Sequence, residues 1–325
     1  MSLSLFAVVR QIYRKGMATF MLEFLQSLPT PVAQGLIWGI MAIGVYITFR
    51  VLDLADLTVD GTLSTGGAVL VIMTTSGVNI YVALICSFLA GCLAGLVTGI
   101  FHTKFGIPAI LAGILTQLAL YSVNLRIMSG KANVTISWRN FNLIVSSRTT
   151  TLPYTILICC IFVAAVIAVL YWFFGTEYGH SIRATGCNAA MARANGINTD
   201  TRKIVGLVLS NGLVALSGGL WSQFNGAADV NSGRGAIVIG LAAVIIGEVV
   251  FGKIFKNFAL KLLAAVFGAI IYYIVIAVVL KMGLDANDLK LLTALVVAFA
   301  LGVPYWKSHI APKKAKNAEG GTQNA

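Results

Sequence analysis

Charged residues are scarce in this 325-residue chain. Asp, Glu, Lys and Arg together make up 10% of it, whereas a soluble domain has roughly 25%. Hydrophobic residues account for 58%, and this composition excludes an ordinary soluble protein. Apolar runs of about 20 residues recur, each long enough to cross a bilayer as a helix. Because backbone groups find no water in lipid, we expect helices and not open sheets. The sequence therefore predicts an all-α fold, a polytopic transmembrane helical bundle.

The motifs of common enzyme classes are also missing. The chain has no HExxH, no GxSxG and no clustered His or Cys ligands, so a membrane hydrolase or metalloenzyme has little support. Its five cysteines show no CxxC spacing, and we interpret them as apolar packing residues. Residues 247–253, GEVVFGK, match most of a phosphate-binding loop, but Ile254 stands where the loop needs Ser or Thr to hold Mg²⁺. We therefore expect no cofactor in this chain.

Positive charge exceeds negative charge by 12, since the chain has 23 Lys and Arg against 11 Asp and Glu. The basic residues are spread among loops and tails, without a basic stripe interleaved with aromatics, so no nucleic-acid partner is expected. Attraction to anionic membrane lipid and retention of basic loops in the cytoplasm explain the charge better. Glu248 lies in a predicted span, where it either pairs with Lys253 or Lys256 or faces a transport path.

The apolar runs divide the chain into an amphipathic segment at 1–28, a membrane domain at 29–306 and a polar cytosolic tail at 307–325. The loop at 124–150 is expected to form short extracellular strands or a cap. If residues 61–76 cross fully, the N-terminus lies outside; if they are re-entrant, it lies inside. We predict about eight spans and one broken or re-entrant segment. The spans are expected at 32–49, 80–101, 108–123, 152–174, 204–222, 236–251, 258–280 and 291–306, and the broken segment at 61–76.

Three aspartates lie between two apolar stretches with almost no loop residues to separate them, in the sequence LDLADLTVDG. Acidic side chains at membrane depth are costly and persist where they face a water-filled path or pair with a cation. The alternative is an interfacial turn capped by aspartate. We predict that Asp53, Asp56, Thr58 and Asp60 line or gate a translocation path.

The longest polar, non-repetitive interval is Glu177–Lys203, which lies between two apolar runs. Its basic residues outnumber its acidic ones, which is typical of a cytosolic loop. The Ala-rich stretch CNAAMARAN predicts a short helix, since an Asn precedes the alanines and Gly196 follows. The interval is either an ordinary loop between spans or a docking helix that receives force from a cytosolic partner.

Two stretches resemble a known family. Residues 178–184, YGHSIRA, and 196–198, GIN, resemble the coupling loop of permease subunits from ABC importers of the branched-chain amino acid and ribose type. Residues 51–67, VLDLADLTVDGTLSTGG, are similar to permeases whose proposed substrates include tryptophan and other aromatic amino acids. The resemblance extends from about Gln34 to about Trp306.

The resemblance implies a permease subunit in the plasma membrane of a prokaryote. Its expected partners are a cytosolic ABC ATPase that binds ATP, an extracytoplasmic substrate-binding protein and a second permease copy. It also implies that the polar interval couples the permease to the ATPase, through Ser181, Arg183, Ala184, Ala189, Ala190, Gly196, Ile197 and Asn198. The alternative function is a secondary transporter driven by an ion gradient, with the three aspartates as proton or sodium ligands.

Overall fold

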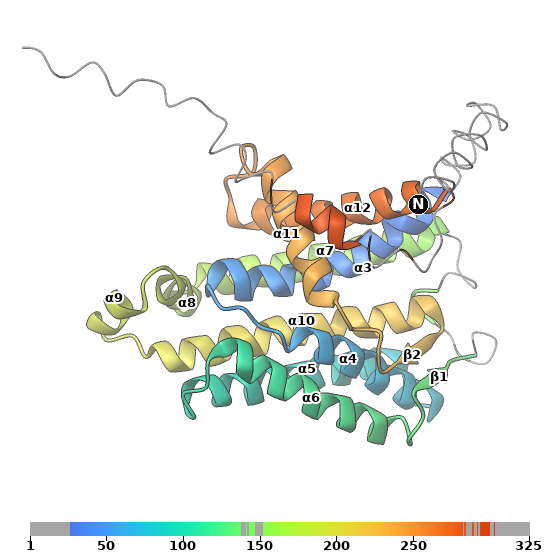
Figure 1. Ribbon diagram of the computed structural model, residues 1–325, viewed down its shortest axis with the longest axis horizontal. Helices are drawn as coiled ribbons and strands as arrows, with labels where there is room; N and C mark the ends of the chain where they lie inside the picture. Colours follow the sequence, from blue (N-terminus) through green and yellow to red (C-terminus); the bar gives the residue numbers. More distant parts are fainter. Residues whose placement is uncertain are drawn as a thin grey trace, which may run out of the picture.

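Most of the apolar runs form helices that lie along one common axis, whereas the helix at 236–251 crosses that axis (Figure 1). The structure is a computed structural model. It describes residues 27–137, 141, 143–146, 152–281, 283, 288, 291, 293–299 and 302. Almost all of the predicted segment 1–28 and the whole tail 307–325 therefore lie outside the described residues.

Helices account for nearly all of the described secondary structure, as predicted. The long ones are α3 (Pro29–Tyr46), which continues as the π-helix η1 (Ile47–Val51), α4 (Val59–Thr75), α5 (Ile80–Thr103), α6 (Ala109–Ile127), α7 (Leu152–Gly175), α10 (Thr199–Asn225), α11 (Ala236–Phe251) and α12 (Phe258–Lys281). Two short helices, α8 (Glu177–Cys187) and α9 (Ala189–Ala194), lie between α7 and α10. Two three-residue strands, β1 (Asn133–Thr135) and β2 (Ala227–Asp229), complete the described elements.

Six described helices are long and apolar enough to cross a membrane, and they match six of the predicted spans. The predicted span 236–251 is helical as α11 but has only 16 residues. The broken segment was predicted at 61–76, but the structure places the break earlier, at 52–58. Helix α4, which follows the break, is continuous. The last predicted span, 291–306, lies mostly outside the described residues.

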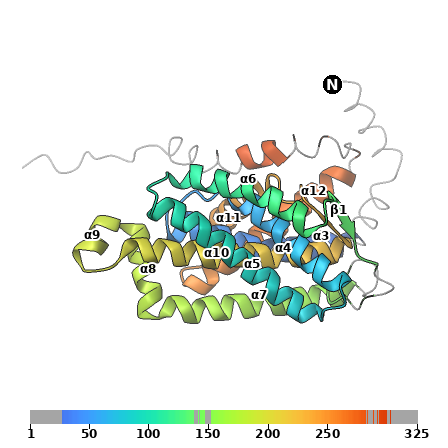
Figure 2. The same ribbon diagram turned by 90° about the horizontal axis from the view of Figure 1, so that it is seen from below.

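The long helix α10 forms the centre of the bundle and packs against α3, α4 and α5. In their apolar windows, 83% of α3 and 67% of α10 are buried, whereas only 17% of α7 and 22% of α6 are. Figure 2 shows α6 and α7 at opposite edges with α10 between them. Most of the large side chains that α5, α6 and α7 leave exposed are apolar, which suits contact with lipid; Arg126, in the last turn of α6, is an exception.

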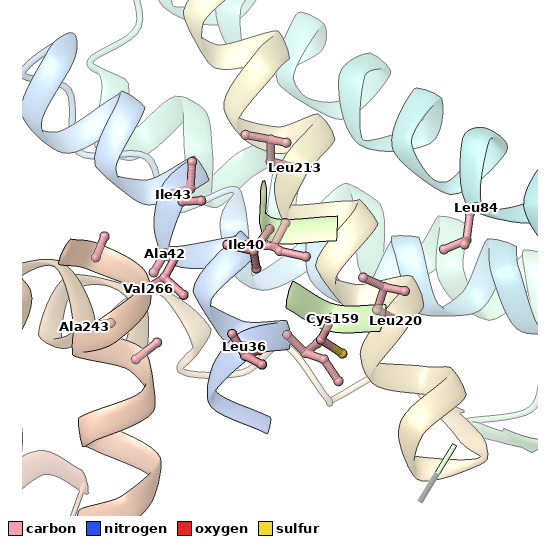
Figure 3. Close-up of a cluster of buried hydrophobic side chains, with 14 of the residues drawn as sticks. Leu36, Ile40, Ala42, Ile43, Leu84, Cys159, Leu213, Leu220, Ala243 and Val266 are labelled. Atoms are coloured by element: carbon pink, nitrogen blue, oxygen red, sulfur yellow. The ribbon is translucent and has the colours of Figure 1, made fainter. Parts of the chain in front are cut away.

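Side chains from several helices meet in one apolar core (Figure 3). Ile40 and Ile43 of α3 pack with Leu213 of α10 and with residues of α7, α11 and α12. Cys159 of α7 is completely buried there, as expected for an apolar packing residue, but Cys187 at the end of α8 is exposed. This core fixes α3 against both α10 and the α11–α12 pair.

A glycine stripe allows α5 to approach α10 closely. A Cβ atom added at Gly91 or Gly95 would collide with the backbone of α10, at Asn211 and Leu207 respectively. At Gly99 the added atom would crowd Ile204. The prediction that this small-xxx-small pattern serves close helix packing is therefore confirmed.

Strands β1 and β2 pair antiparallel, with Val134 opposite Ala228. They lie at the end of the bundle opposite α8 and α9 (Figure 1). The loop 124–150, which was expected to form extracellular strands or a cap, contains β1. Helix α3 starts at the strand end and α4 ends there, so the chain between Val51 and Thr75 runs from one end to the other.

Candidate translocation path and coupling site

The polar interval folds into two short helices that project from one end of the bundle (Figure 1). The Thr176 hydroxyl caps α8 by accepting from the Gly179 N–H at 3.3 Å. The Asn188 side chain caps α9 by accepting from the Met191 N–H at 3.0 Å. Gly196 then adopts a left-handed φ of 77° that favours glycine. The predicted short helix with an Asn cap and a Gly stop is therefore confirmed as a structure.

The predicted coupling residues divide into two groups by exposure. Ser181, Arg183, Ala189 and Ile197 are partly buried, and Ala184, Ala190, Gly196 and Asn198 are exposed. Sequence reasoning missed Met191, whose side chain is 65% exposed on α9 beside Ala190. The tip therefore exposes small side chains and one flexible thioether together with polar side chains such as Arg193 and Asn195.

Two arginines fasten the interval to the bundle. The Arg183 guanidinium donates to the Phe174 carbonyl oxygen and lies 5.1 Å from the centre of the Phe258 ring. The Arg202 guanidinium carbon lies 3.5 Å from the centre of the Tyr178 ring, a cation–π contact. Arg183, predicted as a coupling residue, therefore holds α8 against α7 and α12.

Helix α8 touches the broken segment directly. At Gly186, a Cβ atom would collide with the carbonyl oxygen of Val51 and lie 3.0 Å from the Leu52 Cα atom. Only glycine leaves room for the two backbones at this position. The predicted coupling interval and the predicted path segment are thus in contact, although they are more than a hundred residues apart in the sequence.

Near the start of the broken segment, Asp53 is exposed and has a left-handed φ of 54°. A left-handed conformation is uncommon for a residue other than glycine. The Leu54 N–H donates to the Thr48 carbonyl oxygen at 2.9 Å, so the backbone turns back toward the bundle. The turn carries the next aspartate, Asp56, into the interior.

Asp56 and Thr58 lie in a buried polar network. The Asp56 carboxylate accepts from the Thr58 N–H at 2.9 Å and from the Asn211 amide nitrogen at 2.7 Å. The Thr62 hydroxyl donates to the Asn211 amide oxygen at 2.8 Å. The network continues because the Thr58 hydroxyl lies 2.8 Å from that of Thr98. It joins the broken segment to α4, α5 and α10.

The Asp56 carboxylate is buried without a basic side chain beside it in the described part of the chain. Asp56 is 3% exposed, and no Lys, Arg or His among the described residues forms an ion pair with it. In a lipid-embedded domain such a carboxylate is costly, which makes Asp56 a candidate functional residue. Asp56 and Thr58 do not face open solvent in this conformation, and their role in a path stays a prediction.

Asp60 lies in the first turn of α4, and its side chain contacts the start of α11. Its two carboxylate oxygens accept from the Gly235 N–H and the Ile237 N–H, each at 2.9 Å. A carboxylate is favourable here because the first N–H groups of a helix have no partners within it. Asp60 therefore fastens α4 to the α10–α11 connector.

A cavity of about 350 Å³ adjoins Asp60. The residues that line it include one acid, one arginine, two amides and one tyrosine. They are Asp60, Gly61, Gln117, Leu118, Tyr121, Asn124, Val230 and Arg234. Sequence reasoning missed every one of these residues except Asp60. The available signal was weak, since Gln117 is a single polar residue in a predicted span and Asn124 was assigned to the loop that follows that span.

Glu248 pairs with neither Lys253 nor Lys256. The Arg50 Nε donates to the Glu248 Oε2 at 3.0 Å, and the Arg50 Nη2 donates to the same oxygen. The two residues are 198 positions apart, so no local pattern could reveal the pair. It joins η1 to α11 at the end that holds α8.

The known proteins that this chain resembles in sequence are described as permeases. Residues 30–302 match the family model described as the permease component of the branched-chain amino acid transport system. The chain is 41% identical to the tyrosine transport system permease protein of Clostridioides difficile (strain R20291), over 81% of this chain and 86% of that protein. It is 28% identical to the ribose import permease protein RbsC of Escherichia coli (strain K12), over 64% of this chain and 65% of that protein.

The fold is also found in a solved structure. PsaBC from Streptococcus pneumoniae, determined in complex with a Fab, matches 92% of this chain and 98% of its own chain with a TM-score of 0.52. The sequence identity is 16%, so the similarity concerns the arrangement of helices alone.

Proposed function

The chain belongs to the family of permease components of branched-chain amino acid transport systems, and from this premise we propose that it forms the membrane path of an ATP-driven amino acid importer. It is a multi-pass protein of a prokaryotic plasma membrane and a transport subunit, not the subunit that hydrolyses ATP. The proposed complex contains a cytosolic ATPase, an extracytoplasmic binding protein and a second permease copy.

The observation that best supports the proposal is the contact between Gly186 and Val51. An ATPase that grips α9 and the exposed face of α8 would move α8. Because protein interiors are closely packed, and backbone meets backbone here, that movement must displace Val51. The displacement would reach the broken segment at 52–58 and, through Asp56, the polar network of α4, α5 and α10.

The proposed substrate is an amino acid with an aromatic or branched side chain. The support is the relative at 41% identity, which is described as a permease of tyrosine transport. In the proposed complex the binding protein selects the substrate at the outer end, where β1 and β2 lie. The permease then needs only enough affinity to pass the substrate onward.

The driving force would come from the partners. A two-state protein moves only if something binds its two states with different free energies. The binding protein would favour the outward-open state of the permease. ATP-bound ATPase dimers would drive the permease to alternate between its two states. A permease without these partners has no source of free energy for accumulation.

Reconstitution tests the proposal. Lipid vesicles containing the chain alone should neither hydrolyse ATP nor concentrate L-tyrosine or L-leucine under a proton or sodium gradient. Adding the cognate ATPase and binding protein should start ATP-dependent uptake, with D-ribose as the negative control. Gradient-driven accumulation by the chain alone would instead establish an ion-coupled secondary transporter.

A further inference from the structure

The cavity beside Asp60 lies where three elements meet. Helices α4 and α6 are side by side in both views (Figures 1 and 2) and in contact. The third wall is the connector before α11, which supplies Val230 and Arg234. Gly233 in this connector packs against the Asp60 backbone so closely that a Cβ atom would collide with it. The connector therefore cannot withdraw from Asp60 without losing this contact and the bonds from Gly235 and Ile237.

Asn124 is the residue that points to a ligand. Its side chain is 1% exposed and lines the cavity. Neither its amide nitrogen nor its amide oxygen has a hydrogen-bond partner among the described residues. A buried donor and a buried acceptor left unpaired cost free energy that a bound polar group would recover.

The two charges of the cavity are also available. Neither Asp60 nor Arg234 forms an ion pair within the described part of the chain. Each Asp60 oxygen accepts one backbone N–H, and a carboxylate has about four acceptor positions, so about two remain. Arg234 is exposed and presents a guanidinium, which suits a carboxylate. Unpaired charges inside a membrane domain are expected at a substrate path.

We propose that this cavity binds one zwitterionic amino acid in transit, with its ammonium group at Asp60 and its carboxylate at Arg234. Asn124 and Gln117 bond polar groups of the substrate, and Tyr121, whose side chain is 41% exposed, covers an aromatic or apolar side chain. The volume of about 350 Å³ is near the lower limit of the roughly 300–1,000 Å³ of ligand pockets, so one small molecule fits. This site rests on the proposed function, since it assumes that amino acids cross.

The test uses the full complex in lipid vesicles with L-tyrosine and a saturating amount of binding protein. Arg234→Gln and Asn124→Leu should each lower the maximal uptake rate about tenfold or more, because each removes a polar contact to the substrate. Arg126→Gln, which changes a nearby exposed arginine that does not line the cavity, should transport normally. Co-purification of the ATPase checks that each variant still assembles.

A second readout separates substrate contact from structural damage. In a chain whose five cysteines are replaced by serine, Tyr121→Cys should react with a water-soluble thiol reagent, and L-tyrosine should slow that reaction. Tyramine, which lacks the carboxylate, should protect Arg234→Gln as well as it protects the wild-type background. Normal uptake by both Arg234→Gln and Asn124→Leu would refute the proposal that the cavity binds the substrate. It would mean that Asn124 bonds only to water. Failure of the wild-type complex to transport any amino acid would instead refute the proposed function.

Discussion

Replacing Gly186 with alanine should uncouple ATP hydrolysis from uptake, because this residue is where α8 touches the broken segment. The added methyl group would collide with the Val51 carbonyl oxygen. The obstacle is backbone and not the end of a flexible side chain, so α8 or the 51–52 peptide must shift. Overpacking of this kind costs about 1–3 kcal/mol.

The size of the functional effect follows from that cost. If the close contact exists in one state of the cycle and is relaxed in the other, the whole penalty falls on one state. A difference of about 1–3 kcal/mol shifts a two-state equilibrium about 5–150-fold. Maximal uptake should therefore fall by at least about fivefold, while the fold retains most of its other contacts.

The assay compares ATP consumed with L-tyrosine taken up by the same reconstituted complex. Gly186→Ala should hydrolyse ATP without the normal stimulation by loaded binding protein. Gly175→Ala is the matched control, since a Cβ atom there meets nothing within 4 Å and the residue ends α7. It should couple normally, and a thermal unfolding scan should find it as stable as the wild-type chain.

Normal coupling in Gly186→Ala, with the variant fully assembled, would refute the reasoning. It would mean that force from the ATPase reaches the path by another route. A loss of coupling equal in Gly186→Ala and Gly175→Ala would also refute it, because the control lacks the collision.

The remaining predictions concern the tip, the polar network and the path. Ala190→Glu should abolish co-purification of the ATPase without affecting membrane insertion, as measured by affinity pull-down from solubilised membranes; unchanged complex formation would contradict docking on α9. Thr98→Val should destabilise the chain by about 1–3 kcal/mol, because the buried Thr58 hydroxyl loses its partner; an unchanged unfolding temperature would contradict this. A cysteine at Asp53 should react quickly with a water-soluble thiol reagent, whereas one at Asp56 should react only when ATP drives the cycle; equal rates at both positions would show that the network does not shield Asp56.

Local features of this chain could be read from the sequence. The Asn188 cap and the Gly196 stop define α9 because both act on backbone groups within a few residues. The glycines of α5 indicated a close helix contact because side-chain volume decides how near two backbones come. The length of each apolar run fixed six spans to within a few residues.

Long-range partners could not be read in the same way. Asp56 was visible as an acid at membrane depth, but its partner Asn211 is 155 positions away. Asp60 was expected beside a path, yet its contact with the start of α11 depends on how the connector folds back. Asn211, a polar residue inside a predicted span, is the signal that sequence reasoning underused, since a polar side chain at membrane depth is costly unless it is paired.

The pairing of β1 with β2 constrains how the protein is made. Strand β1 precedes α7 and strand β2 follows α10. Both of these spans must therefore be synthesised before the ladder between Val134 and Ala228 can form. During synthesis β1 therefore stays unpaired until β2 has been translated. A formed ladder therefore requires that α7 and α10 have already been synthesised.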